Sequence, residues 1–315
     1  MVPPVPKTLG SGLDSGSVVT LSSYRAFGLN VCSELEFSGV SPGSGVADVY
    51  VRLGSVPEQL ENAGARGVFY QATDRQLLLN VRHVARYLIS SGNEILVDVA
   101  PGADQGMVSL LLFGSAFGAL LHQRRVLALH GSAIATRHGA MVFAGASGHG
   151  KSTLAGVFQQ RGFPVLADDV CPIETRAFPT VLPANPFLML WADAANRLGI
   201  DERHLRRTRT GLEKFILPLG DNYAVEPTPL HAIYILEPSN LDSFSVTPIH
   251  GIRKIRTLCL NTYRPQFVDA MNLDSQHFRQ VSSVARQTRI SVVKRPIRGF
   301  RVDELADLLA ADFPA

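Results

Sequence analysis

A glycine-rich segment near the middle of the chain has the residue types and spacing that bind phosphate. The pattern G-x-x-x-x-G-K-[ST] is complete over residues 145–152, and Thr153 follows it. Its glycines allow backbone N–H groups to converge on phosphate oxygens, Lys151 can reach the β- and γ-phosphates, and the Ser152 hydroxyl can ligate Mg²⁺. We therefore predict a site for ATP and Mg²⁺ that consists of Gly145, Ala146, Ser147, Gly148, His149, Gly150, Lys151, Ser152 and Thr153.

The residues on both sides of this segment favour a phosphate-binding loop over a chance match in a glycine-rich turn. The apolar run at 141–144 predicts a strand that leads into the loop. After the loop, Leu154, Val157 and Phe158 fall at helical spacing, and Gly162 is a typical helix stop. A strand, a glycine-rich loop and a helix in this order are the context in which such a loop binds a nucleotide.

Two adjacent aspartates, Asp168 and Asp169, follow the short buried strand expected at 164–167. A carboxylate at that position can hold Mg²⁺ directly or through water, and a second one can accept the proton of a substrate hydroxyl. Two neighbouring like charges also raise each other's pKa, which suits a general base. The alternative is a solvated turn, or a helix cap formed by Asp169. Because the pair occurs together with the loop, we predict that both aspartates belong to the catalytic and metal-binding site. The sequence does not show which one is the base and which one binds the metal.

The combination of these motifs resembles the HPr kinase/phosphorylase family. The resemblance covers residues 126–175 and includes Leu129-His130-Gly131-Ser132, the loop at 145–153, Arg161-Gly162 and Ala167-Asp168-Asp169. It implies a fold akin to that of ATP-dependent phosphoenolpyruvate carboxykinase and the phosphorylation of a serine by Mg·ATP. The family's glycine-rich signature is not recognisable after Glu174, and its elements for docking HPr are not evident.

The same resemblance implies roles for individual residues. Lys151 and Ser152 would bind the triphosphate and the metal, the aspartate pair would supply the base and a metal contact, and His130 would lie near the γ-phosphate. From its sequence context alone, His130 is equally well explained as a hydrogen-bonded structural residue. His149 is expected to contribute only its backbone N–H.

The N-terminal segment Tyr24-Arg25-Ala26-Phe27-Gly28-Leu29 looks like that of the divergent HPr-kinase-related proteins encoded with peptide-modification genes. In the lasso-peptide kinases among them, the acceptor is the C-terminal serine of a precursor peptide. The resemblance therefore implies a peptide or small protein as the partner.

The densest basic cluster of the chain lies at 203–209. Its guanidinium groups could bind the carboxylate or acidic side chains of an acceptor, or they could form a solvated helix face or turn. The candidate substrate residues are Arg203, Arg206, Arg207 and Arg209. Lys214 could approach the phosphates, whereas Trp191 and Phe187 are expected in the core.

Composition narrows the possible partners. The chain has 46% hydrophobic and 18% charged residues, and its net charge of +3 is too small to indicate nucleic-acid binding. Three widely separated cysteines fit free thiols in a reducing compartment. The most apolar run, at 107–121, is shorter than the ~20 residues that span a bilayer. We expect a cytoplasmic protein without a membrane partner, and a homo-oligomer is compatible with the sequence.

The pattern of apolar residues predicts an α/β fold: a P-loop kinase core with a small β-rich N-terminal module. The expected division is a flexible lead-in at 1–22, the module at 23–104 and the kinase domain at 105–315. Helices are expected at 108–123, along the face of Phe278, Val281 and Ala285, and along that of Val302, Leu305, Leu308 and Leu309. Strands are expected at 46–53, 67–70, 76–81, 94–99, 126–135, 140–144, 164–167, 230–236 and 290–294.

The sequence leads to an ATP-dependent serine kinase that acts on a peptide or small protein, and two other functions remain open. One is a nucleotide-switched module that binds a peptide, which would need a single metal-holding acid rather than a pair. The other is a kinase for a small metabolite, or a carboxykinase-like enzyme, which the arginine cluster does not exclude.

Overall fold

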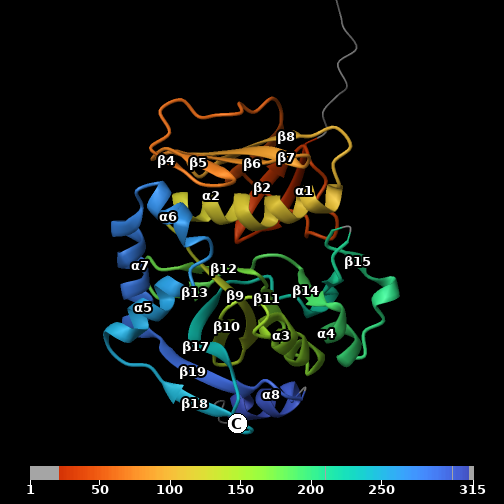
Figure 1. Cartoon of the computed structure of the whole chain (residues 1–315), viewed down its shortest axis with the longest axis vertical. Coiled ribbons are helices and arrows are strands. Elements are labelled where there is room, and N and C mark those ends of the chain that lie inside the picture. The colour runs from red at the N-terminus through yellow and green to blue at the C-terminus, as the bar shows by residue number, and fades with distance from the viewer. Residues whose placement is uncertain (1–20, 210, 300, 312–315) are drawn as a thin grey trace, which may run out of the picture.

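The fold was analysed in a computed structural model of the chain, which describes residues 21–209, 211–299 and 301–311. The predicted lead-in at 1–22 lies outside this part except for its last two residues, and Ser22 begins a strand. The protein is a mixed α/β structure with two large sheets and a long helix between them (Figure 1).

The N-terminal sheet has eight strands, and alternation of buried and exposed residues along them places one face on the core. In spatial order they are β1 (Ser22–Ala26), β2 (Leu29–Ser33), β3 (Val49–Leu53), β8 (Glu94–Val99), β7 (Ala85–Ser90), β6 (Gln76–Val81), β5 (Tyr70–Ala72) and β4 (Ala65–Arg66). The predicted strands at 76–81 and 94–99 are confirmed. The one predicted at 46–53 begins only at Val49, and the prediction at 67–70 is wrong except for Tyr70.

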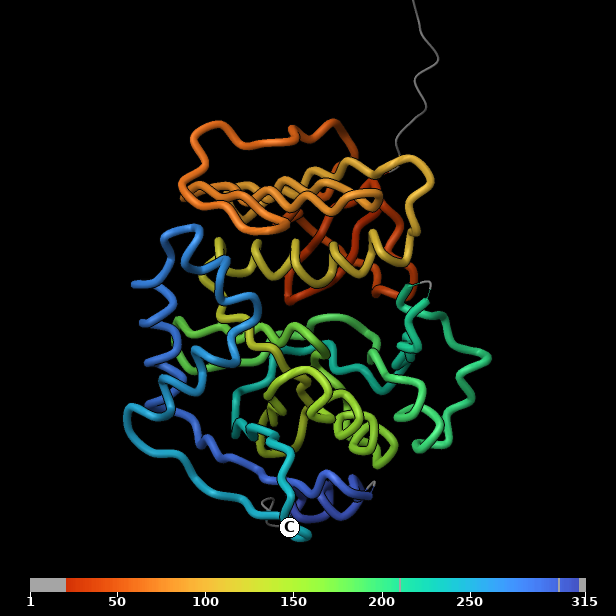
Figure 2. Tube along the Cα trace, in the orientation of Figure 1, coloured from red at the N-terminus to blue at the C-terminus, as the bar shows by residue number. Residues whose placement is uncertain are grey.

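A continuous helical segment runs beneath this sheet, as the trace in Figure 2 shows. It comprises α1 (Gln105–Leu111), a π-helical turn η1 (Leu112–Ala116) and α2 (Phe117–Gln123). Its first turn is capped by the Asp104 carboxylate, which accepts hydrogen bonds from two backbone N–H groups. The predicted helix at 108–123 is confirmed and starts three residues earlier.

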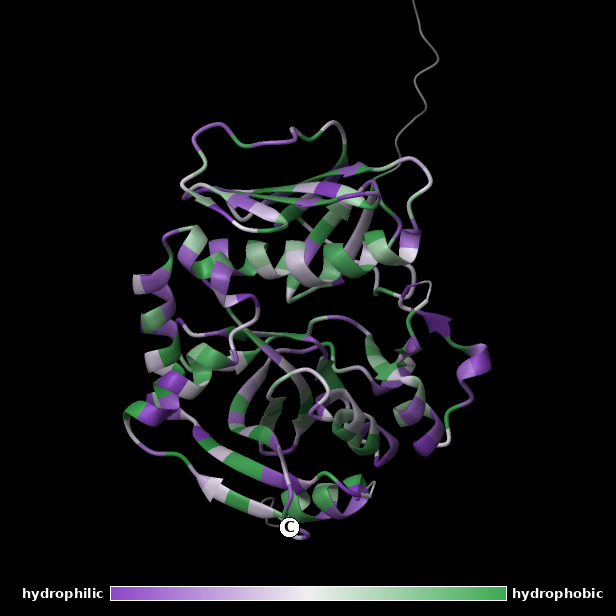
Figure 3. Ribbon diagram, viewed as in Figure 1, coloured by the Kyte–Doolittle hydropathy of each residue, from purple (hydrophilic) through white to green (hydrophobic). Residues whose placement is uncertain are grey.

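The same segment, Gln105–Gln123, is long and apolar enough to cross a membrane by length and composition. Its green and white colouring in Figure 3 reflects this hydrophobic character. However, 67% of the apolar window is buried inside the protein, and Phe117 stacks on Phe27 of the N-terminal sheet at 4.7 Å between ring centroids. Packing between the two sheets therefore accounts for its hydrophobicity.

The second sheet carries the phosphate-loop motif. Its order is β10 (Gly139–Ala144), β9 (Leu127–Thr136), β12 (Val170–Glu174), β13 (Thr180–Val181), β17 (Thr228–Ser239), β19 (Arg289–Pro296) and β18 (Ser245–Pro248), with β11 (Val165–Ala167) paired to β9. Strand β10 also pairs with β17, and β10, β17 and β19 run parallel. Because these three strands are parallel, their carboxyl ends lie at the same edge of the sheet although they are distant in sequence. The loop after β10 begins at this edge.

Smaller elements surround this sheet (Figure 1). A three-stranded sheet consists of β14 (Phe187–Trp191), β16 (Lys214–Pro218) and β15 (Arg206–Arg207). The helices are α3 (Lys151–Gln160), α4 (Ala192–Arg197), α5 (Ile252–Leu260), α6 (Pro265–Ala270), α7 (Asp274–Gln287) and α8 (Val302–Ala310). On the predicted faces of α7 and α8, Val281 and Leu305 are buried as expected, but Phe278 and Leu308 are exposed.

Candidate active site

The phosphate-loop motif forms a tight connection between β10, which ends at Ala144, and α3, which begins at Lys151. Gly145 has a φ of 135°, and a Cβ atom there would come within 2.7 Å of the Leu236 carbonyl oxygen. Gly150 caps α3 in the left-handed region, with a φ of 91°. Glycine is required at both positions, because a side chain would collide with β17 or strain the turn.

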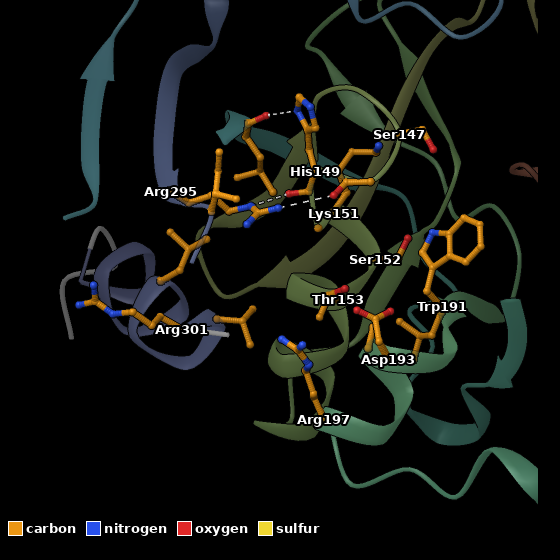
Figure 4. Close-up of a pocket in the computed structure, with 18 of the residues that line it drawn as sticks. Ser147, His149, Lys151, Ser152, Thr153, Trp191, Asp193, Arg197, Arg295 and Arg301 are labelled. Atoms are coloured by element: carbon orange, nitrogen blue, oxygen red, sulfur yellow. Dashed lines mark hydrogen bonds between the residues drawn. The ribbon is translucent and has the colours of Figure 1, made fainter. Parts of the chain in front are cut away.

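Two side chains fasten the loop to the parallel strands (Figure 4). The His149 ring binds the Leu236 carbonyl oxygen through Nδ1 at 2.7 Å, and Arg295 of β19 donates from Nε to the His149 carbonyl at 2.9 Å. The Arg295 Nη2 group donates to the Gly148 carbonyl at 3.5 Å. Because C=O and the next N–H point in opposite directions in a trans peptide, these contacts direct the following N–H groups away from Arg295.

Lys151 is almost fully buried and its ammonium group is enclosed by acceptors. It donates to the carbonyls of Gly145 and Ala146 at 2.9 and 3.0 Å, and its Nζ lies 3.1 Å from His130 Nε2. Burial lowers the pKa of Lys151, and the nearby Asp168 and Asp169 carboxylates raise it. The ammonium group is held where an approaching phosphate would replace these acceptors.

His130 bridges the lysine and the second aspartate. Because Nε2 accepts from Lys151, the ring proton lies on Nδ1, which is 3.1 Å from the Asp169 carbonyl oxygen and 3.6 Å from Asp169 Oδ1. Burial, followed by the charge of Lys151, lowers the pKa of His130. The imidazole is therefore neutral at physiological pH.

Asp168 is buried and both of its carboxylate oxygens accept hydrogen bonds. Its Oδ1 accepts from the Ser132 and Ser152 hydroxyls at 2.6 and 2.7 Å, and its Oδ2 accepts from the Met189 N–H at 2.7 Å. Burial raises the pKa of this carboxyl, while the charge of Lys214 and the three hydrogen bonds lower it. Asp168 consequently orients Ser152 rather than presenting a free oxygen.

Asp169 differs from its neighbour in every one of these respects. Its side chain is 23% exposed, and its backbone is left-handed with a φ of 66°. It lines three cavities: the pocket over the phosphate loop, a small cavity beside Arg206 and an open groove. This is the more accessible of the two carboxylates.

The pocket over the phosphate loop has a volume of about 350 Å³. At one end lie Lys151, Ser152 and Thr153, and at the other lie the apolar side chains Phe244, Ile297, Val302 and Leu305. Figure 4 shows Arg295 and Arg301 on one side and Trp191 and Asp193 on the other. Trp191 is 41% exposed, with the Lys214 ammonium 5.9 Å from its ring, so its predicted place in the core is wrong.

The predicted basic cluster does not gather at one point. Arg206 is exposed and lines the small cavity together with both aspartates. The others also lie on the surface: Arg203 pairs with Asp201 at 2.8 Å, Arg207 pairs with Glu213 at 2.6 Å, and Arg209 is exposed. The segment forms a single 3-10 turn and the short strand β15, as the solvated alternative anticipated.

The oxygen-rich surroundings of Ser152 fit a magnesium ion. Mg²⁺ takes oxygen ligands and is held by few protein groups, with substrate phosphates and water supplying the rest. Ser152 Oγ, held by Asp168, faces the pocket where phosphates would lie. Among residues 21–209, 211–299 and 301–311, no three His, Cys, Asp or Glu side chains form a metal-binding group.

Four residues of the site were not predicted to act there. Ser132 belongs to the quoted His-Gly-Ser run, and that run was the one available signal. Arg295, Tyr263 and Arg264 lie more than ninety residues beyond the aspartates, and nothing in their local sequence connects them with the loop.

Comparisons with known proteins add little. No family model matches the chain, and no curated protein matches it. Among solved structures, the Hpr(Ser) kinase/phosphatase from Coxiella burnetii is similar over 59% of this chain and 95% of that one. The identity is 12% and the TM-score is 0.34, too low to carry a function from one protein to the other.

Proposed function

We propose that this protein is an ATP-dependent kinase that transfers the γ-phosphoryl group to a serine hydroxyl of a peptide or small protein. The observation that supports it most strongly is the junction of the two motifs: Ser152 Oγ lies 2.7 Å from Asp168, and Lys151 reaches Asp169 through His130. The loop that would bind phosphate and a second, accessible carboxylate therefore line the same pocket.

The shape of the pocket orients the nucleotide. Its apolar end suits a purine base, and the loop N–H groups with Lys151 suit the phosphates. Mg²⁺, when bound at Ser152, would neutralise charge on the β- and γ-phosphates. The γ-phosphate would then lie beside Lys151 and His130, at the end of the pocket that Asp169 lines.

The side chains divide the work of phosphoryl transfer. Asp169 is placed to accept the proton of the acceptor hydroxyl, because it is exposed to the pocket and not fully hydrogen-bonded. Lys151 stabilises the charge on the transferred group, and neutral His130 positions the lysine. Asp168 keeps Ser152 oriented. A chain-terminal serine of a lasso-type precursor is the specific acceptor that the sequence resemblance favours.

Mass spectrometry of peptides incubated with the protein and Mg·ATP tests this assignment. A gain of one phosphate on serine is expected with the wild type and not with Lys151→Met, which removes the charge while keeping a similar side-chain length. Circular dichroism would establish that the variant is folded. Consumption of ATP without any labelled peptide would reject the peptide kinase in favour of a nucleotide switch or a metabolite kinase.

A further inference from the structure

A second opening also reaches Asp169. It is a groove of about 620 Å³ between the start of the phosphate loop and the segment at 260–266. Its lining includes Gly145, Ala146, Glu237, Tyr263, Arg264 and Gln266. Five residues line both the groove and the nucleotide pocket: His130, Ser147, His149, Asp169 and Leu236. We call it the 260–266 groove.

The course of the loop indicates which end of the nucleotide meets this groove. Residues 147–153 line the nucleotide pocket, whereas the loop residues that line the groove are 145–147 and His149. The Lys151 ammonium group lies at the boundary, bonded to the carbonyls of Gly145 and Ala146. A γ-phosphate bound by Lys151 therefore faces the groove, and in-line attack requires the acceptor on that side.

The small cavity beside Arg206 is an unsuitable entrance. Its volume of about 60 Å³ provides room for a few water molecules and not for the end of a peptide. Although Arg206 lines it with both aspartates, the cavity is walled by Phe37, Phe113 and Phe187. The open groove is the route of adequate size.

Arg264 is the cation of the groove. Its side chain is exposed, its guanidinium carbon lies 5.8 Å from the centre of the Tyr263 ring, and it forms no ion pair with another described residue. The buried Tyr263 side chain, which ends in a hydroxyl, lines the same groove as Arg264 and Asp169. Gly114 makes room for this hydroxyl, since a Cβ there would come within 2.9 Å of it.

The groups that line the groove define what it would recognise. Asp169 and Arg264 line the same groove, so a ligand that meets both the proton acceptor and the cation carries a hydroxyl and an anion. A chain-terminal serine has this arrangement, because only Cβ and Cα separate its hydroxyl from the terminal carboxylate. Glu237, on the groove wall, would disfavour further negative charge.

We propose that the acceptor enters through the 260–266 groove and that Arg264 binds a carboxylate adjacent to the reacting hydroxyl. This inference rests on the proposed kinase function. The hydroxyl oxygen bonds to the γ-phosphorus, its proton passes to Asp169, and the bond from phosphorus to the β–γ bridging oxygen breaks to release ADP. Arg264 fixes the acceptor and takes no part in the bond changes.

The test uses short peptides that end in serine and compares the C-terminal free acids with the corresponding C-terminal amides. With the wild type, kcat/KM should favour the acids by about 10- to 100-fold, as expected for one charge-assisted hydrogen bond. Arg264→Gln should reduce that ratio to near one without changing the KM for ATP. Arg253→Gln, which alters an exposed arginine on α5, is the matched control and should keep the ratio.

The outcomes separate this inference from the kinase assignment. Phosphorylation without preference for acids, or a preference lost in Arg206→Gln but kept in Arg264→Gln, would overturn the proposed role of Arg264 and leave the kinase intact. The same peptides can also be labelled with fluorescein, and their binding can be measured in the presence of a non-hydrolysable Mg·ATP analogue. This binding measurement does not depend on phosphoryl transfer. An Arg264-dependent preference in binding without any transfer would support the groove and reject the kinase.

Discussion

The same substitution at the two adjacent aspartates should affect different properties: the stability of the fold at Asp168 and the catalytic rate at Asp169. Asp168→Asn places an amide nitrogen where a carboxylate oxygen now accepts a hydrogen bond from Met189 N–H, Ser132 or Ser152. A buried donor is then left without an acceptor, at a cost of about 1–3 kcal/mol. Removing a buried charge offsets part of this, but three short hydrogen bonds and Lys214 already compensate that charge. We expect a net loss of about 2 kcal/mol in the free energy of unfolding.

Asp169→Asn should leave the free energy of unfolding within about 0.5 kcal/mol of the wild type. Asparagine tolerates the left-handed backbone at this position, and the carboxylate is 3.6 Å from His130 without a short hydrogen bond. If Asp169 is the proton acceptor, kcat should instead fall by about 100- to 10,000-fold, the usual contribution of a general base. Binding of Mg·ATP should be unchanged.

Urea unfolding, nucleotide titration and single-turnover phosphate transfer on the wild type and both variants measure the three quantities. Asp168→Asn should also weaken Mg·ATP binding, because Ser152 loses the acceptor that orients it. The reasoning fails if Asp168→Asn unfolds at the same urea concentration as the wild type. It fails equally if Asp169→Asn retains kcat within a factor of two while Asp168→Asn alone abolishes it.

Two further predictions concern groups near the site. Arg295→Lys should raise the KM for ATP several-fold, because a lysine cannot bind the carbonyls of Gly148 and His149 with the same planar group; an unchanged KM would show that the loop does not need this anchor. Acid should destabilise the fold through His122, which is buried against the Tyr263 carbonyl and whose pKa burial lowers from 6.5 to about 4. Because the unfolded imidazole binds a proton below pH 6.5 and the folded one does not, the free energy of unfolding should fall by about 2 kcal/mol between pH 7 and pH 5. Urea unfolding at both pH values should show a smaller loss in His122→Gln, and an equal loss would exclude His122 as the cause.

The strand–loop–helix at residues 141–160 could be predicted from sequence because its requirements are local. A glycine-rich turn, a lysine and the periodic apolar residues on each side suffice to define it. The position of Asp168 beside Ser152 could also be predicted from sequence, since the strand before it is short and close in sequence to the loop. The sequence does not predict which aspartate is buried, because that depends on Ser132 and on the Met189 N–H of a separate sheet.

The rest of the site depends on strand order, which hydrophobic periodicity does not specify. Arg295 reaches the loop because β19 lies parallel to β17, and β17 in turn lies beside β10. Tyr263 and Arg264 line the same groove as Asp169 because the segment after α5 crosses over β9, where Tyr263 N–H donates to the Ala128 carbonyl. Trp191 was misplaced for a related reason: its aromatic side chain predicts burial, whereas the end of β14 opens onto the pocket.

The turn between β1 and β2 has a consequence for how the chain folds. Phe27 is buried with a φ of 54°, a conformation unfavourable for an aromatic residue. Its N–H donates to the Ala184 carbonyl, and that of Gly28 donates to the Pro183 carbonyl. A hairpin at the beginning of the described chain thus completes the hydrogen bonding of a segment more than 150 residues later. The amino-terminal strands and the segment before β14 are therefore cooperative partners in folding, and a chain that lacked the first hairpin would leave backbone acceptors beside β14 without donors.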